Sequence, residues 1–260
     1  MSIENLGKVE VSIVFPAYNE AERLEEAVKK TIEALEEFTR SYEVIIAEDG
    51  STDGTDKIAS ELSMRYPKVR HIHSDRRLGR GLALKNAFNN SRGEILAFMD
   101  VDLATDIKHL KTLVESIKEG YDIAIGSRMH PESKVERTLS RRIASKWYNF
   151  MVRALLGSKI RDHQCGFKAF KRELILQILK ETEATHWFWD TEILVRASRR
   201  GCRIKEIPVE WRSGKETKVH LFKDSLTMGW QVLKFWWKLK RQSFSGNRNP
   251  KNAKMHFNRN

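Results

Sequence analysis

The most constraining feature of this sequence is the alternation of short apolar runs with amphipathic segments over its first half. This alternation is typical of βαβ units, in which a strand, a helix and a second parallel strand follow one another. We predict strands at 9–15, 43–47, 69–73, 94–99 and 121–125, with helices at 20–38, 55–66, 79–90 and 107–118. A mainly parallel α/β sheet binds ligands at the carboxyl ends of its strands, so a site is expected in the loops that follow them.

The second half has a different pattern. A basic segment with helical periodicity covers 139–156, and a further helix and a strand at 203–209 follow. We interpret this part as an elaboration of the first domain, which gives one domain over 1–220. An amphipathic helix is predicted at 221–242, and the polar, Asn-rich segment 243–260 is expected to be a disordered basic tail.

Composition limits the class of protein. The chain has 260 residues and a formal net charge of +12, so its surface attracts anions such as nucleic acid, lipid headgroups or phosphorylated substrates. The two cysteines, Cys165 and Cys202, lie far apart without metal-ligand spacing, which favours a reducing cytoplasm over a disulfide framework. We find no secretory signal and no apolar run of about 18 residues, so any membrane contact is expected at the surface.

Two loops after predicted strands carry polar residues suited to a nucleoside. The first strand ends in PAYNE, and the helix that follows favours anions at its N-terminus. The second ends in AEDGSTDGT, where Asp49 stands in a position from which a carboxylate accepts hydrogen bonds from a base or ribose. Each segment is also compatible with an ordinary turn, with Asn19 capping the first helix.

The third loop follows the apolar strand EILAFM and begins with Asp100 and Asp102. Side chains at i and i+2 of an extended segment point to the same side, so the two carboxylates can converge on one cation. Oxygen ligands suit Mg²⁺ or Mn²⁺, whose remaining positions take water and diphosphate oxygens. The alternative is that Asp102 caps a helix beginning near Thr105.

Several basic residues fall in the same group of loops. Arg76, Arg77, Arg80 and Lys85 surround two glycines, although most such side chains are simply solvated. Their positions in the predicted loops favour anion binding for Arg128, Arg212 and Lys218.

Taken together, the segments FPAYNE, EDGSTDGT, GRGLALKNAF, DVDLAT, GSR and RRIAS resemble the family 2 glycosyltransferases of the GT-A fold, in particular the dolichyl-phosphate glucose and mannose synthases. The resemblance covers roughly residues 9–220. It implies a Rossmann-like α/β fold and transfer of a hexose from a nucleotide diphosphate sugar to a polyprenyl or dolichyl phosphate. The partners implied are these two substrates and a membrane surface.

The resemblance also implies roles for individual residues. The nucleoside would be held by Pro16, Ala17, Tyr18, Glu20 and Asp49. The metal and diphosphate would lie at Asp100, Val101 and Asp102, and the diphosphate would also contact Arg128, Arg212 and Lys218. The acceptor phosphate would be bound by Arg128, Arg141 and Ser145. Asp190 stands where related enzymes carry an acidic residue near the acceptor, or it caps a helix beginning at Thr191.

One departure bears on the donor. Mannose synthases carry a glutamine where this chain has Ala104, and DLAT, QCGFKAF and FWDTEIL are more similar to the glucose synthases. We therefore expect UDP-glucose, with GDP-mannose as the alternative. A lipid phosphate is ionised at neutral pH and needs no strong general base, so direct displacement would invert the anomeric carbon. A transferase with a hydroxyl acceptor would instead require Asp190 as its base.

The segment 221–241 places basic and polar residues on one stripe of a helix and Trp-rich apolar residues on the rest. Such a helix suits the headgroup interface of a membrane, which predicts a peripheral protein on the cytoplasmic face. The alternatives are that it packs onto the core or forms an oligomer contact. Nucleic-acid binding is not expected, because no recognition motif of that class is present.

Overall fold

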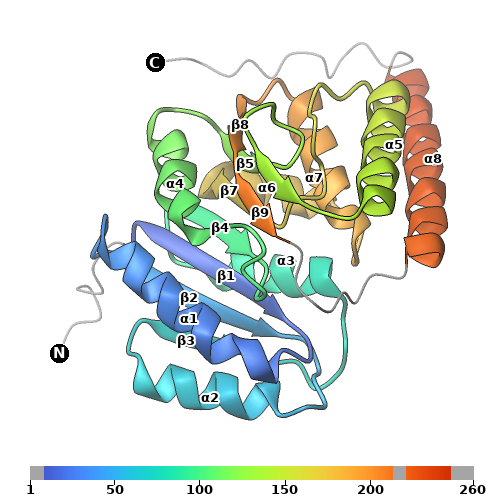
Figure 1. Ribbon diagram of the computed structural model, residues 1–260. Helices are drawn as coiled ribbons and strands as arrows, with labels where there is room; N and C mark the ends of the chain where they lie inside the picture. Colours follow the sequence, from blue (N-terminus) through green and yellow to red (C-terminus); the bar gives the residue numbers. More distant parts are fainter. Residues whose placement is uncertain (1–8, 213–220, 247–260) are drawn as a thin grey trace.

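The computed structural model describes residues 9–212 and 221–246. Its centre is a seven-stranded sheet with the strand order β3-β2-β1-β4-β7-β5-β8 (Figure 1). Neighbouring strands run parallel except for β7, which is antiparallel to both β4 and β5. The expected mainly parallel α/β sheet is therefore confirmed.

The elements alternate along the first half of the chain as the sequence predicts. The strands are β1 (Val11–Ala17), β2 (Tyr42–Glu48), β3 (Val69–Ile72), β4 (Ile95–Met99), β5 (Ile123–Ser127), β6 (Lys134–Glu136), β7 (Phe167–Lys171), β8 (Ile204–Pro208) and β9 (Glu210–Arg212). The helices are α1 (Ala21–Glu36), α2 (Thr55–Arg65), α3 (Arg80–Asn90), the 3₁₀ helix η2 (Ile107–His109), α4 (Leu110–Lys118), α5 (Leu139–Leu156), α6 (Arg172–Glu181), α7 (Phe188–Arg199) and α8 (Leu221–Gly246).

Helices cover both faces of the sheet, because alternate side chains of each buried strand point to opposite sides. In β1, Ile13 and Phe15 pack toward α1, α2 and α4, whereas Val14 packs toward α3, α6 and α7. All three are fully buried. Full burial of such a side chain contributes roughly 1.5–3 kcal/mol, so these two cores fix the loops at the carboxyl ends of the strands.

Strand β7 was not predicted from the sequence. It lies between β4 and β5, with Lys168 opposite both Phe98 and Ile125. Lys168 is fully buried and takes part in an ion pair that is described below. In the sequence, a short segment with two lysines three residues apart is typical of an exposed surface. The strand depends on a long-range partner that local periodicity does not reveal.

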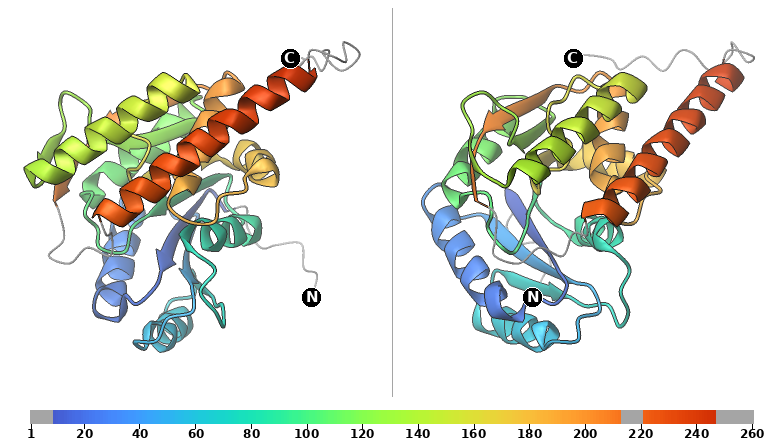
Figure 2. Two further views of the ribbon diagram at one scale, coloured as in Figure 1. Left: turned by 90° about the vertical axis from the view of Figure 1, so that its right-hand side faces the viewer. Right: turned by 45° about the vertical axis from the view of Figure 1, so that its right-hand side comes forward.

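Helices α5 and α8 form a further layer beyond α7, and they lie side by side (Figure 2). Tyr148 and Val152 of α5 meet Val232 and Phe235 of α8 in a third core with Val195 of α7. Strand β6 pairs with β9 in a separate two-stranded sheet. Helix α8 continues to Gly246, four residues into the segment expected to be disordered, and 247–260 lies outside the described residues.

Candidate active site

The acidic loop after β4 forms the centre of the site. The backbone N–H of Asp100 donates to the carbonyl of Gly166 (3.1 Å), and a tight turn follows in which Leu103 has φ +47°. Asp100 and Asp102 line one small pocket with backbone and apolar neighbours: Met99, Leu103, Ala104, Thr105, Gly166 and Phe167. The two residues expected to share a cation thus line the same pocket.

Asp102 does not cap a helix. Its Oδ1 accepts the N–H of Ala104 (3.0 Å), whereas η2 begins at Ile107 and is capped by Asp106, whose Oδ1 accepts the N–H of Lys108 (3.0 Å). Asp102 therefore shapes its own turn and keeps its second oxygen for other partners. Partial burial raises the pKa of Asp102, and the neighbouring charge of Asp100 raises it further.

This pocket fits a divalent cation. The donors are carboxylate oxygens, which suit Mg²⁺ or Mn²⁺, and a cation between them would relieve the repulsion that raises the pKa of Asp102. Gly166 permits the arrangement, because a Cβ at that position would lie 1.8 Å from Oδ2 of Asp100. Another trio, Glu48, His71 and His73, has ligand atoms within 4.8 Å of one another, but its imidazoles suit zinc-like metals better.

A network of buried ion pairs fixes the position of the Asp100 carboxylate. Arg80, the first residue of α3, donates from Nη2 to Oδ1 of Asp100 (2.8 Å) and from Nη1 to Oδ2 of Asp190 (2.6 Å). Nζ of Lys168 donates to Oδ1 of Asp190 (2.6 Å). Burial alone would lower the pKa of Arg80, but the charges of Asp190 and Asp100 outweigh it and hold that pKa above its usual range.

Asp190 is consequently not a helix cap. Helix α7 begins at Phe188, so Asp190 lies within its first turn, 3% exposed and with one cation on each carboxylate oxygen. The sequence did not predict that Arg80 and Lys168 belong to this network. The glycine that follows Arg80 is the one sequence feature that indicates its position. A Cβ at Gly81 would lie 2.6 Å from Cβ of Trp189, so the start of α3 packs directly against α7.

The two loops expected to hold a nucleoside lock together. Pro16 and Ala17 end β1, and the ring of Tyr18 lies 3.9 Å from the guanidinium carbon of Arg77. Asn19 does not cap α1 with its side chain, because its Oδ1 accepts the N–H of Thr52 (2.9 Å).

The second loop supplies the cap of α1 instead. The N–H of Glu20 donates to Oγ1 of Thr55 (2.8 Å), and the N–H of Ala21 donates to Oδ2 of Asp53 (3.1 Å). A carboxylate near these orphan N–H groups also interacts favourably with the helix dipole. The DGSTDGT segment therefore fixes the position of the PAYNE segment.

Asp49 also has backbone partners. It is buried, and its two oxygens accept the N–H groups of Leu78 (2.6 Å) and Gly79 (2.9 Å). The carboxylate thus ties the end of β2 to the loop before α3. A nucleoside contact would use the lone pairs that remain on these oxygens.

The basic residues predicted to contact phosphate fall into three groups. Arg128 is buried and forms a two-pronged ion pair with Asp162 (Nε–Oδ2 2.7 Å and Nη2–Oδ1 2.9 Å). Arg212 is exposed at the end of β9, and its backbone N–H donates to the carbonyl of Ala104 (2.8 Å), which places it beside the acidic loop. Lys218 lies outside the described residues.

Val101 is a core residue at 3% exposure, so only its backbone is available to a ligand. Arg141 and Ser145 lie one turn apart on the first half of α5, where both are half-buried. The structure thus places Arg212 beside the loop of Asp100 and Asp102. Arg128 instead forms a buried ion pair with Asp162 at the end of β5.

The fold defines the class of protein. Crystal structures of glucosyl-3-phosphoglycerate synthase from Mycobacterium tuberculosis superpose on this chain, including a complex with uridine diphosphate (TM-score 0.67, 21% identity, 88% of this chain and 79% of that one). A complex of the same synthase with Mn²⁺, uridine diphosphate and phosphoglyceric acid gives a TM-score of 0.63 at 21% identity, over 86% and 76%. The fold is that of the GT-A glycosyltransferases.

The chain belongs to glycosyl transferase family 2, whose model matches residues 12–179. It is 51% identical over 234 residues to Glycosyltransferase AglD of Haloferax volcanii, covering 89% of this chain but 38% of that relative. The dolichyl-phosphate beta-glucosyltransferases of Saccharomyces cerevisiae (32%, 84% of this chain and 71% of the relative) and Homo sapiens (33%, 86% and 74%) are also similar. The chain is a glycosyltransferase that spans well under half the length of AglD.

Among the described helices, none combines the length and the apolar character needed to cross a bilayer.

Proposed function

We propose that this glycosyltransferase transfers a hexose, with inversion, from a nucleotide diphosphate sugar to a polyprenyl or dolichyl phosphate at the cytoplasmic face of a membrane. The observation that carries the proposal is the pocket shared by Asp100 and Asp102. It offers oxygen ligands that would hold a divalent cation, whose charge would favour a diphosphate, and Arg212 lies beside the pocket for the same anion.

UDP-glucose is the donor we favour. The similar synthase structures contain uridine diphosphate, and one of them also contains Mn²⁺. The relatives named dolichyl-phosphate beta-glucosyltransferase support glucose as the sugar. GDP-mannose remains the alternative donor, and Ala104, which lies in the acidic pocket, is the residue that argues against it.

The lipid phosphate acceptor is supported by the state of Asp190. A hydroxyl acceptor requires a general base within reach of its proton, whereas an ionised phosphate already carries the attacking oxygen. Asp190 is 3% exposed, and both of its oxygens accept hydrogen bonds from cations, Arg80 and Lys168. It is therefore poorly suited to accept a proton from substrate.

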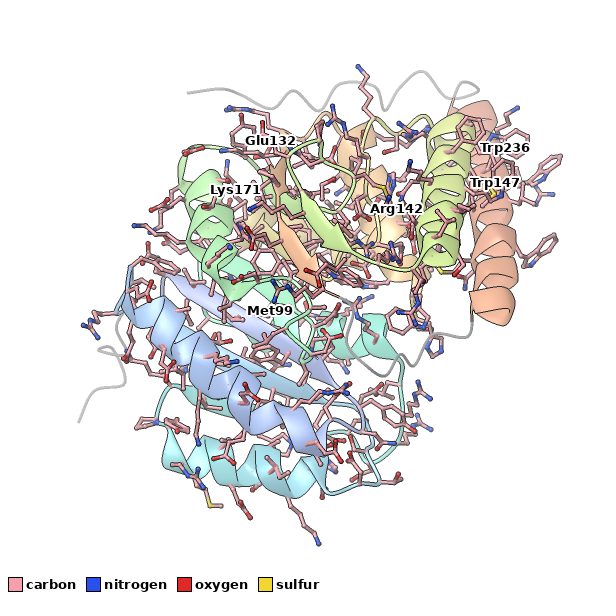
Figure 3. The ribbon with its side chains drawn as sticks, viewed as in Figure 1. Met99, Glu132, Arg142, Trp147, Lys171 and Trp236 are labelled. Carbon is pink, nitrogen blue, oxygen red and sulfur yellow. The ribbon has the colours of Figure 1, made fainter. Side chains whose placement is uncertain are left out.

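A surface on α5 and α8 supports delivery of the acceptor from a membrane. Four apolar side chains of α5 are exposed on one helical face, and three of α8 are exposed on another, opposite the buried face of each helix. They are Leu139, Ile143, Trp147 and Phe150 on α5 with Trp230, Leu233 and Trp237 on α8. Figure 3 labels Trp147 and Trp236 at this edge of the molecule.

Exposed cations accompany this aromatic surface: Arg142 and Lys146 on α5 and Lys234 on α8. Indole rings favour the headgroup level of a bilayer, and lysine or arginine favours anionic lipids. Helix α8 thus packs on the core with one face, which is one of the three interpretations of its sequence, and its exposed tryptophans lie on the opposite face.

The chemistry assigned to the chain's own residues is positioning and charge stabilisation. An oxygen of the lipid phosphate attacks the anomeric carbon, the bond from that carbon to the diphosphate breaks, and the nucleoside diphosphate leaves. Asp100 and Asp102 would hold a divalent cation, which would supply charge neutralisation for the diphosphate. Arg212 adds a cation beside them, and Arg80 holds Asp100 in place.

A donor panel tests the proposal. The protein is incubated with Mg²⁺ or Mn²⁺, a short polyprenyl phosphate and either UDP-glucose, UDP-N-acetylglucosamine or GDP-mannose, and lipid-linked sugar is measured. Transfer from UDP-glucose that Asp102→Asn abolishes is expected. Absence of transfer from every donor would reject the lipid phosphate acceptor, and transfer from GDP-mannose alone would correct the sugar.

A further inference from the structure

Glu48, His71 and His73 form a cluster of metal-ligating side chains away from the acidic pocket. Each residue offers one ligand atom, and the three atoms lie within 4.8 Å of one another. None of the three lines the pocket of Asp100 and Asp102. That pocket follows β4, whereas the cluster lies at the ends of β2 and β3, and β1 separates β2 from β4 in the sheet. The cluster is therefore a separate place for a cation.

The alternation of side chains along two strands brings the cluster together. Strands β2 and β3 are parallel neighbours, with Ala47 opposite Ile72, and both of these residues pack on the side of α3. Their chain neighbours Glu48 and His71 consequently point to the other face of the sheet, the one that α1 and α2 cover. His73 follows the end of β3, two residues after His71, and lies on the same side.

Hydrogen bonds orient two of the three side chains. Nδ1 of His73 lies 2.6 Å from Oε2 of Glu48, and Nε2 of the same ring lies 3.3 Å from Oδ1 of Asp75. The second oxygen of Glu48, Oε1, accepts the N–H of Ser51 (2.5 Å). Histidines and carboxylates that bind a metal are commonly held in this way through their other polar atom. The ligand atoms of His73 and Glu48 are thus directed before any metal arrives.

His71 contributes a nitrogen that the rest of the described chain does not use. Its Nε2 is buried and has no hydrogen-bond partner among the described residues. Nearly all buried polar atoms in proteins have a partner, so this nitrogen requires an explanation, and a metal ion supplies one. Its burial does not oppose binding, because crowded ligand atoms shield one another from water. The side chain of His73 is 47% exposed, so the cluster is reached from its side.

Two imidazoles and one carboxylate favour a metal of the zinc class. Mg²⁺ prefers oxygen ligands and keeps several waters, whereas Zn²⁺ binds nitrogen and oxygen and is usually four-coordinate. Three protein ligands leave one position for a water molecule. A metal ion would also take the place of the proton between Nδ1 of His73 and Oε2 of Glu48, so this contact is compatible with binding.

We propose that Glu48, His71 and His73 bind a Zn²⁺ ion that fastens the end of β2 to β3. Through Glu48 the ion would act on Ser51, whose Oγ accepts the N–H of Asn19 (3.0 Å) in the PAYNE segment. The role is structural, since the ion would add a tie beneath the two loops that are expected to hold the nucleoside. Binding of the ion does not depend on the sugar, the acceptor or turnover.

The experiment measures Zn²⁺ binding by calorimetry after a chelator has removed bound metal and has itself been removed. Every protein carries Asp102→Asn and is kept in excess Mg²⁺, so that the acidic pocket does not contribute. This reference protein is compared with His73→Gln, with His71→Gln and with the control His186→Gln, at an exposed histidine in the loop before α7. Co²⁺ is the second probe, because its visible absorption is strong when it is four-coordinate and weak when it is six-coordinate. Melting temperatures are recorded with and without Zn²⁺.

We expect the reference protein to bind Zn²⁺ and to melt at a higher temperature when Zn²⁺ is present. His73→Gln and His71→Gln should each weaken binding at least tenfold and lose the strong Co²⁺ absorption, whereas His186→Gln should behave like the reference. Absence of Zn²⁺ binding in the reference overturns the proposal, as does a loss of less than tenfold in either variant. His73 is half-exposed, so its variant should fold and decides the outcome alone if His71→Gln does not fold.

Discussion

Arg80 donates a 2.8 Å hydrogen bond from Nη2 to Oδ1 of Asp100, so the first carboxylate of the acidic loop is held by a helix from another part of the chain. The arginine is 12% exposed, and its guanidinium carbon lies 5.0 Å from the ring centre of Phe98. Because the second prong of the same guanidinium binds Asp190, the position of Asp100 depends on the packing of α3 against α7.

Removal of this guanidinium should destabilise the protein. Arg80→Met leaves the buried carboxylate of Asp190 with one cation, and it removes the 2.8 Å ion pair that holds Asp100. Breaking a buried ion pair from one side costs about 3 kcal/mol or more. Urea denaturation should show a fall of that size, whereas Arg76→Met, at an exposed arginine of the preceding loop, should change the free energy of unfolding by less than about 0.5 kcal/mol.

Gly166→Ala tests the placement of Asp100 without a change of charge. The added methyl would lie 1.8 Å from Oδ2 of Asp100, so the carboxylate must move. A displacement of about 1 Å in a reacting site lowers the rate roughly 100-fold. Gly229→Ala is the control, because the nearest atom to its new methyl is Cε of Met151 at 3.7 Å; a variant of Gly166 with parental kcat would refute the role of this contact.

Asp190→Asn separates the two kinds of acceptor. The change removes the anion that pairs with Lys168 and Arg80, so stability should fall by about 3 kcal/mol. At a temperature where the variant is folded, transfer to a lipid phosphate should persist with the parental pH dependence. If Asp190 were the base for a hydroxyl acceptor, Asp190→Asn would abolish turnover. Any activity that remained would no longer depend on pH through the deprotonation of Asp190.

The buried imidazole of His163 predicts a loss of stability in acid. Its Nδ1 donates to Oδ1 of Asn149 (2.7 Å), its Nε2 accepts from Oγ of Ser158 (2.8 Å), and burial lowers its pKa to about 3. The unfolded chain binds a proton near pH 6.5 and the folded one does not, so stability is intact above pH 6.5. It falls by up to about 1.4 kcal/mol per pH unit below that value.

The comparison with His163→Gln isolates this contribution. Free energies of unfolding measured from pH 7 to pH 5 should fall more steeply in the parent than in the variant, because the variant lacks the group that titrates only on unfolding. Equal slopes would show that His163 is not held neutral. Asp162 does not interfere, since the charge of Arg128 outweighs burial and holds the pKa of Asp162 below its usual range, so its contribution to stability is lost mainly below about pH 5.

The aromatic surface of α5 and α8 should bind membranes. Trp147→Ser combined with Trp237→Ser removes two indoles, 66% and 59% exposed, that lie outside the third core. Sedimentation with vesicles that contain anionic lipid should show a loss of binding of at least tenfold, and binding in the parent should weaken with salt. Met64→Ser removes an exposed apolar side chain of α2 and should bind like the parent.

The periodicity of the sequence predicted the parallel part of the fold because buried strands and amphipathic helices are local patterns. Helix α5 begins and ends at Leu139 and Leu156, as predicted, and β8 differs from its prediction by one residue at each end. Strand β7 was not predictable in the same way. Its buried Lys168 is stabilised by Asp190, 22 residues away along the chain.

The same distinction applies to the site. That Asp100 and Asp102 line one pocket at the end of β4 was predictable, since both directly follow a buried strand. The partners of Arg80, Arg128 and Arg137 were not, because a single sequence does not show which arginine finds a carboxylate. Arg128 pairs with Asp162, 34 residues later, whereas Arg137 has no such partner among the described residues.

The anomeric configuration of the lipid-linked product tests the central proposal most directly. UDP-glucose carries an α-linked sugar, and a single in-line displacement by the lipid phosphate gives a β-linked product. Proton NMR of the product purified from UDP-glucose and a short polyprenyl phosphate should therefore show the β configuration, with none formed by Asp102→Asn. An α-linked product, or glucose found only on a hydroxyl, would contradict inverting transfer to a lipid phosphate.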